Sequence, residues 1–169
     1  MAESNHELIA EAVRSSLAAI NGDSGLTYWF TPGAVVRTLW FEETGPNSVL
    51  DSSITGPIYA IRPGEEDHTE GTTQEIDAAM DLFILVAAPF GTPDSPFEPA
   101  NPSRWTVINR MVRDVLRKLL QDVQLLSIGG AVENVMATPT IVDRDRFVEG
   151  WAIAEIHLRI SYSYVGGVP

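Results

Sequence analysis

The chain has 169 residues, a formal net charge of −12 and no cysteine. This length fits one domain covering residues 1–169. The lack of cysteine excludes disulfides and thiolate metal sites, and the acidic balance argues against a protein that wraps nucleic acid. The opening MAESNHELIAEAV has no basic region of a signal peptide, and the longest apolar run, LFILVAAPF, is far shorter than the ~20 residues of a spanning helix. We expect a soluble, intracellular protein with no membrane segment.

The first part of the chain predicts one helix followed by short strands. Apolar residues recur every three or four positions through residues 6–20, which is the period of an amphipathic helix. The segments LTYWF (26–30), AVVRTLWF (34–41) and IYAI (58–61) are rich in β-branched and aromatic residues, so they favour strands. Residues 62–75 are rich in glycine, threonine and acids, which predicts an acidic loop.

Two longer segments alternate between apolar and polar residues with a period of two, the period of a strand. In EIDAAMDLFILVAA (75–88) the apolar face consists of Ile76, Ala78, Met80, Leu82, Ile84 and Val86. In EGWAIAEIHLRISYSY (149–164) it consists of Ala152, Ala154, Ile156, Leu158, Ile160, Tyr162 and Tyr164. The opposite face of each segment is polar at one end. We expect both to be strands and to pair antiparallel.

A proline-rich segment and a second helix lie between these two strands. Five prolines fall within residues 89–102 and favour extended geometry, either as a stiff loop crossing the sheet or as an arm lying on a neighbouring subunit. Residues 103–121 form a second amphipathic pattern, and 131–136 predict a further strand. The expected fold is α/β of the α+β kind: a single mixed or antiparallel sheet, with helices 6–20 and 103–121 packed on one face.

No motif in the sequence specifies a reaction, a cofactor or a metal. The three histidines are isolated, and none has the spacing of a metal site. Glu155, His157 and Arg159 share one face of the terminal strand, a combination able to move protons. A solvated face or a salt-bridged subunit contact explains them equally well, and catalysis is disfavoured because no nucleophile or glycine-rich loop accompanies them.

The second predicted helix carries a basic stripe. Arg110, Arg113 and Arg117 follow one another at helical spacing, opposite the apolar stripe. They are able to meet phosphate, but in a chain with 23 acids an acidic neighbour is the better interpretation. We expect them to pair with acids of an adjacent subunit.

The order of these elements resembles the tail terminator (tail-completion) proteins of long-tailed bacteriophages. The resemblance rests on a short helix ending in AAING, a Thr-Pro-Gly turn before AVVRTLWF, the strand EIDAAMDLFILVAA, the helix INRMVRDVLRKLLQ and the closing EGWAIAEIHLRISYSY. Together these cover roughly two-thirds of the chain; the segments 89–102 and 62–75 depart from the pattern. The resemblance implies an α/β protein that forms a homo-oligomeric, hexameric ring, caps the tail tube and docks it to the head connector. It implies no enzyme activity, so there are no catalytic residues to carry over.

Such a role also implies partners and a location. The partners are other copies of the chain, the tail tube protein and the head–tail connector protein, with DNA passing through without specific binding. The location is the head-proximal end of the tail in the virion, and the host cytoplasm during assembly. Glu155, His157 and Arg159 then belong to a subunit contact or lumen surface. The acids Glu65, Glu66, Asp67 and Glu70 either line the channel and repel DNA phosphates or form a solvated loop.

Three other interpretations stay open at this point. The first is a different component of the same phage assembly, such as a tail-tube protein or a head–tail connector. Tube proteins are mostly β, whereas this chain predicts two helices. A small enzyme would use the Glu155, His157 and Arg159 face. An adaptor would bind one partner through the proline-rich segment 89–102.

Overall fold

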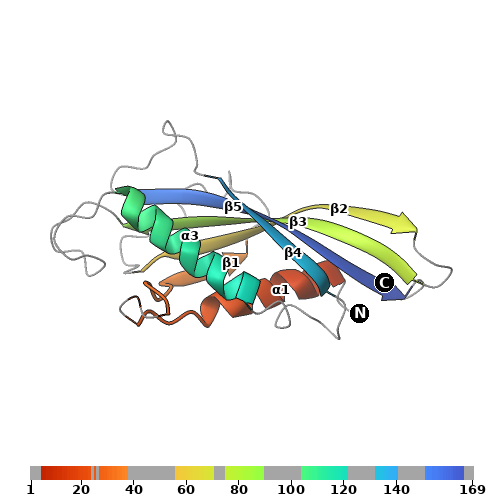
Figure 1. The fold of residues 1–169 in the computed structure, drawn as a ribbon, viewed down its shortest axis with the longest axis horizontal. Helices are drawn as coiled ribbons and strands as arrows, with labels where there is room; N and C mark the ends of the chain where they lie inside the picture. The colour runs from red at the N-terminus through yellow and green to blue at the C-terminus, as the bar shows by residue number, and fades with distance from the viewer. Residues whose placement is uncertain are drawn as a thin grey trace.

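The computed structural model describes residues 5–23, 25, 27–37, 56–70, 75–89, 104–121, 132–140 and 151–165. They form two helices and five strands (Figure 1). In chain order these are α1 (Asn5–Ala18), β1 (Ala34–Arg37), β2 (Ile58–Glu70), β3 (Glu75–Pro89), α3 (Arg104–Gln121), β4 (Val132–Thr140) and β5 (Trp151–Val165). No helix in these ranges combines the length and apolar character needed to cross a membrane.

The five strands form one mixed sheet in the order β1-β2-β3-β5-β4. The short strand β1 runs parallel to β2, and every other neighbouring pair is antiparallel. Sheet and helices together make an α+β fold, as the sequence predicts.

The two long strands β3 and β5 pair along their whole length, which confirms the predicted antiparallel pair. Glu75 lies opposite Val165 at one end and Pro89 opposite Trp151 at the other. Even-numbered residues of β3 therefore face even-numbered residues of β5, for example Leu82 opposite Leu158. This register puts both predicted apolar faces on the same side of the sheet, where they form the centre of the core.

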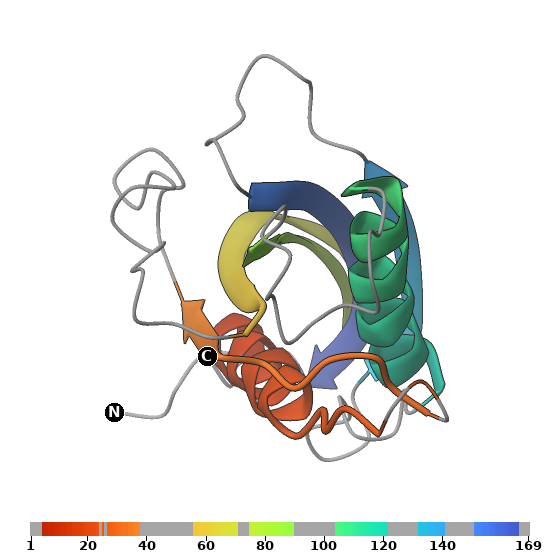
Figure 2. The ribbon, with the colours of Figure 1, turned by 90° about the vertical axis from the view of Figure 1, so that its left-hand side faces the viewer.

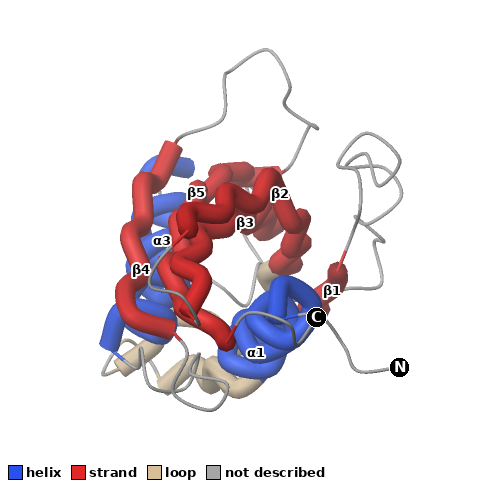
Figure 3. Tube along the Cα trace, turned by 90° about the vertical axis from the view of Figure 1, so that its right-hand side faces the viewer, coloured by secondary structure: helices blue, strands red, loops and turns tan. Residues whose placement is uncertain are grey.

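Both helices belong to that same core. The buried helix residues in it are Ile9, Ala10, Val13, Leu17, Val107, Ile108, Met111, Val115 and Leu119. In the end-on views the sheet curves around this side, and α1 and α3 lie within the curve (Figures 2 and 3). The spacing of three and four residues gives each helix one apolar stripe, and the sheet face is the surface on which that stripe is buried.

The predicted strand 26–30 is wrong, because two carboxylates bind its backbone N–H groups. One oxygen of Asp23 accepts the N–H groups of Thr27 and Tyr28 at 2.7 and 2.9 Å. One oxygen of Asp114 on α3 accepts those of Trp29 and Phe30 at 2.8 and 2.9 Å. Because these four backbone N–H groups are already hydrogen-bonded, residues 27–30 need no neighbouring strand to satisfy them. They form an irregular segment beside α3.

The predicted acidic loop 62–75 is wrong for residues 62–70 and 75, because β2 continues to Glu70 and pairs with β3, which begins at Glu75. Residues 71–74 lie outside the described residues. The register of β2 with β3 shifts between Pro63 and Glu66. Among the described residues, the pairing of β1 with β2 reaches Ile61. A proline without an N–H is tolerated at a bulge and on an edge. At Gly64 an added Cβ would lie 2.8 Å from the Phe83 ring, so the bulge approaches β3 too closely for a side chain.

The remaining predicted boundaries agree with the structure where it describes them. The helix 6–20 corresponds to α1, the helix 103–121 to α3, and the strand 131–136 to β4, which extends to Thr140. Of the strand 34–41, residues 34–37 are β1, and 38–41 lie outside the described residues. Apart from Pro89, which ends β3, the proline-rich segment 89–102 also lies outside them.

Candidate functional site

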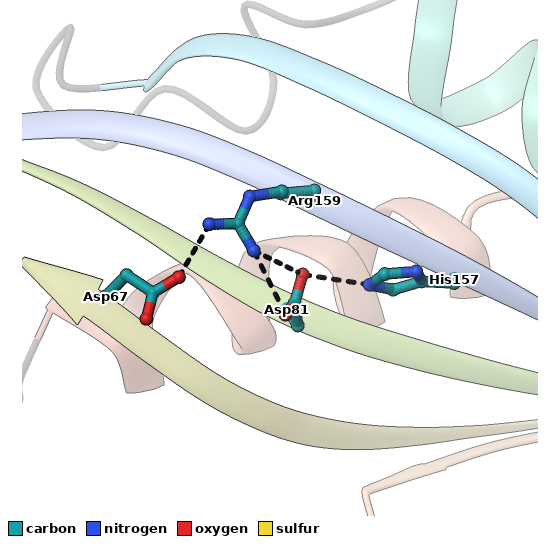
Figure 4. Close-up of polar contacts among 4 residues, drawn as sticks. All are labelled: Asp67, Asp81, His157 and Arg159. Atoms are coloured by element: carbon teal, nitrogen blue, oxygen red, sulfur yellow. Dashed lines mark hydrogen bonds and ion pairs between the residues drawn. The ribbon is translucent and has the colours of Figure 1, made fainter.

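The polar side of β3 and β5 lies on the sheet face that is turned away from α1 (Figure 4). Odd-numbered residues of the two strands share this outer face. The register places Asp81 opposite Arg159 and Phe83 opposite His157. Toward the other end of the sheet the same face becomes apolar, where Ala87 pairs with Ile153 and both are buried. The polar residues are therefore gathered on one half of the outer face.

Four of these side chains form a connected network (Figure 4). Nε2 of His157 lies 2.8 Å from Oδ1 of Asp81. Arg159 donates to both oxygens of Asp81 at 3.2 Å and to Oδ2 of Asp67 at 2.6 Å. Arg159 on β5 thus reaches across β3 to β2, and it ties the outer ends of three strands together. The hydrogen bond with Asp67 and the charge of Asp81 raise the pKa of the Arg159 guanidinium.

Aromatic and cationic groups form a second row across the same strands. The guanidinium carbon of Arg62 lies 4.3 Å from the centre of the Phe83 ring. The Phe83 ring stacks on the His157 imidazole with centroids 4.9 Å apart and planes 13° from parallel. Stacking against Phe83 and the bond to Asp81 together fix the orientation of His157.

The contacts of this arrangement join side chains of the sheet to one another. A carboxylate bonded to a histidine is the usual way to orient a general base. Here the same carboxylate is neutralised by Arg159, and the recorded contacts of the imidazole are to Asp81 and Phe83. Within the described ranges no group of three or more His, Asp or Glu side chains is placed to hold a metal ion.

The sequence grouped His157 and Arg159 of the network correctly and missed Asp67 and Asp81. Glu155, His157 and Arg159 do share one face of β5, as alternation predicts. Asp81 and Asp67, which join His157 and Arg159 into a network, come from β3 and β2. Antiparallel pairing of β3 with β5 was predictable, but the register that sets Asp81 opposite Arg159 was not. Asp67 was assigned to a loop.

The arginine stripe of α3 is largely engaged within the chain. The guanidinium carbon of Arg110 lies 4.0 Å from the centre of the Trp29 ring. Arg117 donates to the carbonyl of Thr27 at 2.6 Å. Only Arg113 of the three is fully exposed. The stripe therefore holds residues 27–30 against the helix, a role that the sequence did not predict.

The four acids proposed for a channel wall do not share one face. Glu66 pairs in register with Met80 of the core side, whereas Asp67 pairs with Ala79 of the outer side. Glu65 is exposed at the bulge, and Glu70 ends β2 opposite Ile76. Asp67 is moreover bound to Arg159. The acids of β2 therefore do not form a single wall made of Glu65, Glu66, Asp67 and Glu70.

Replacing Arg159 with glutamine tests whether the network holds the end of β2. We expect little change in the denaturation midpoint, because the ion pairs are partly exposed. Amide hydrogens of residues 66–70 should exchange roughly two- to fivefold faster, since Asp67 and Asp81 lose the cation between them. Hydrogen exchange measured by mass spectrometry or NMR reports this directly. The control is Arg113→Gln, which removes an exposed arginine without touching the network; equal exchange in both variants would contradict the assigned role.

Comparison with known proteins gives no assignment. No protein-family model matches the chain, and a search of curated proteins finds no match.

Proposed function

We propose that the protein is a structural virion component. Copies assemble into a ring, of six subunits in the resemblance to tail terminators, that caps the phage tail tube and joins it to the head connector. The partners are the chain itself, the tail tube protein and the connector, and the site of action is the head-proximal end of the tail. DNA passes through the ring without specific binding, which suits a chain with a net charge of −12.

The observation that supports an assembly role is the length of the sheet relative to its helices. The 15 residues of β5 extend over roughly 50 Å at about 3.3 Å per residue. The 18 residues of α3 extend over roughly 27 Å at about 1.5 Å per residue. Figure 1 shows the ends of β2, β3 and β5 projecting beyond both helices. We call this end of the sheet, made of residues 65–70, 75–79 and 161–165, the arm; Ala78 and Tyr162 within it are still buried in the core, and the strands continue past them.

The arm is longer than the core of a single subunit requires. A free strand edge or uncovered sheet face exposes groups able to pair with another chain, and proteins protect such surfaces or use them in assembly. On the outer face beside the arm, Arg159 links β2, β3 and β5. A projection of three linked strands with a polar surface is suited to reaching a neighbouring subunit in a closed ring.

Electron microscopy tests this function. The purified protein, examined by negative stain alone and after mixing with assembled tail tubes, should form rings and should place one ring at one end of each tube. A mass measurement by light scattering gives the number of subunits. Rings that bind the head connector but never a tube end would instead assign the protein to the connector, and a monomer that binds neither would overturn the proposal.

A further inference from the structure

The outward face of α3 carries basic side chains, of which Arg110 and Arg117 hold residues 27–30 against the helix while Arg113 stays exposed. Helix α3 holds five of the eleven basic residues of the protein within 18 residues, namely Arg104, Arg110, Arg113, Arg117 and Lys118. At the middle of the outward face lies Arg113, which is exposed and has no recorded partner among the described residues. Leu120, 42% exposed, lies on the same side of the helix, and Trp29, 37% exposed, borders it through Arg110.

The arm carries the opposite charge. Between Pro63 and Asp81 the sequence has seven acids and neither lysine nor arginine. Asp67 and Asp81 are paired with Arg159, and Glu66 lies 3.7 Å from His68. Glu65 and Asp77 are exposed, and neither has an ion-pair partner among the described residues. Asp77 lies on the outer face of the arm, opposite Ser163. Its charge is therefore directed away from the core.

We infer that the outward face of α3 binds the acidic arm of a second copy of this chain, with Arg113 facing Glu65 and Asp77. This inference rests on the proposed ring and names the surfaces of its subunit contact. Two different surfaces meet, so the contact is head-to-tail, the kind that closes into a ring when the rotation between copies allows it.

Charge complementarity selects a second copy as the occupant. Two chains of net charge −12 repel each other at long range, so copies associate only where local surfaces of opposite sign meet. The basic face of α3 and the acidic arm are such a pair. Within one chain they do not meet, because the arm is the end of the sheet that projects beyond both helices, away from α3 (Figure 1). The exposed side chains of Leu120 and Trp29 supply apolar area at the edge of the contact.

Two complementary variants test the contact. The first is Arg113→Glu, which makes the helix face acidic. The second is Glu65→Lys with Asp77→Lys, which makes the exposed arm positions basic. In each variant alone, like charges meet at the contact, and the dissociation constant for self-association should rise at least about fivefold. In an equimolar mixture every contact again joins opposite charges, so assemblies of alternating variants should form at the parental concentration.

Sedimentation velocity of the parent, each variant and the mixture measures the outcome at low and high salt. The control is Arg14→Glu, which makes the same change of charge on α1. It also breaks the ion pair of Arg14 with Glu11 within that helix, and it should still assemble like the parent. If both variants assemble like the parent, or if their mixture stays as dissociated as its components, the inference is overturned. A parent that assembles through this contact but binds no tail tube would refute the proposed function and leave the inference standing. A parent that stays monomeric would overturn the inference, and the proposed function falls with it only if that monomer also binds neither tail tube nor connector.

Discussion

Leu158→Asp should prevent stable folding. Leu158 lies at the centre of β5 with no exposed surface, opposite Leu82 of β3, on the face that packs against the helices. A carboxylate at this position loses its hydration and finds no partner in an apolar core. The cost is several kcal/mol, about 4 or more, against a typical total stability of about 5–15 kcal/mol for a domain. We expect a large loss of the cooperative thermal transition seen by circular dichroism.

The control for this variant lies three residues away on the other face of the same strand. Ser161→Asp introduces the same carboxylate, but Ser161 is only partly buried and lies on the outer side, opposite Ala79. Its effect should stay below about 1 kcal/mol, as for most substitutions away from a core. If the Leu158 variant melts like the parent, the side of β5 that faces the helices has been assigned wrongly.

The long elements were predictable because their patterns agree with their burial. In β3 and β5 every second residue is apolar over a dozen positions, and only one face of a strand satisfies such a pattern. Ile156 and Leu158 on β5, and Met111 and Val115 on α3, are buried where the two periods place them. In these elements the apolar pattern of the sequence agrees with the burial in the fold, so the pattern alone was sufficient to predict them.

The irregular segment 27–30 and the bulge in β2 were not predictable because distant residues determine them. Residues 27–30 have strand-forming side chains, yet their backbone donors bind Asp23 and the distant Asp114. In β2, glycine, proline and acids indicate a loop. Pairing with β3 extends the strand because the bulge at Pro63 absorbs the mismatch. In both places the backbone conformation depends on a contact with a distant part of the chain, which the local sequence does not reveal.

The candidate site was predictable only in part for a related reason. Alternation alone puts His157 and Arg159 on one face of β5. Their partner Asp81 depends on register, and a shift of one residue would have sent it to the other side. For the arginine stripe, the sequence predicted the positions on the helix but not the contacts within the chain. Its helical spacing was correct, but spacing does not reveal that Trp29 and Thr27 lie against Arg110 and Arg117.

Asp114 should make the stability of the protein depend on pH in an unusual direction. Its carboxylate is 1% exposed, and it accepts the N–H groups of Trp29 and Phe30. Burial raises its pKa from an ordinary 3.8 to about 6, against the opposing effects of those two donors and of the Arg117 charge. Asp23 adds to the rise, and the charge of Asp114 together with burial raises the pKa of the neighbouring Tyr59.

The sign of the effect follows from where the proton binds more tightly. The folded protein holds the Asp114 proton up to about pH 6, whereas the unfolded chain releases it near 3.8. Protonation therefore stabilises the fold. This contribution is complete below about pH 4 and is lost as the pH rises through about 6. Most paired carboxylates act in the opposite direction, because their pKa is lowered on folding.

Comparison with Asp114→Asn isolates this contribution, because the amide oxygen still accepts the two N–H groups but does not titrate in this range. The free energy of unfolding of the parent, relative to that of the variant, should fall by about 2 kcal/mol between about pH 4.5 and 7.5. Urea denaturation at several pH values measures both proteins, and the other acids, common to both, cancel in the difference. A difference that is constant with pH would contradict a titrating Asp114. A difference that grows with pH would mean that the two N–H donors and Arg117 outweigh burial at this carboxylate.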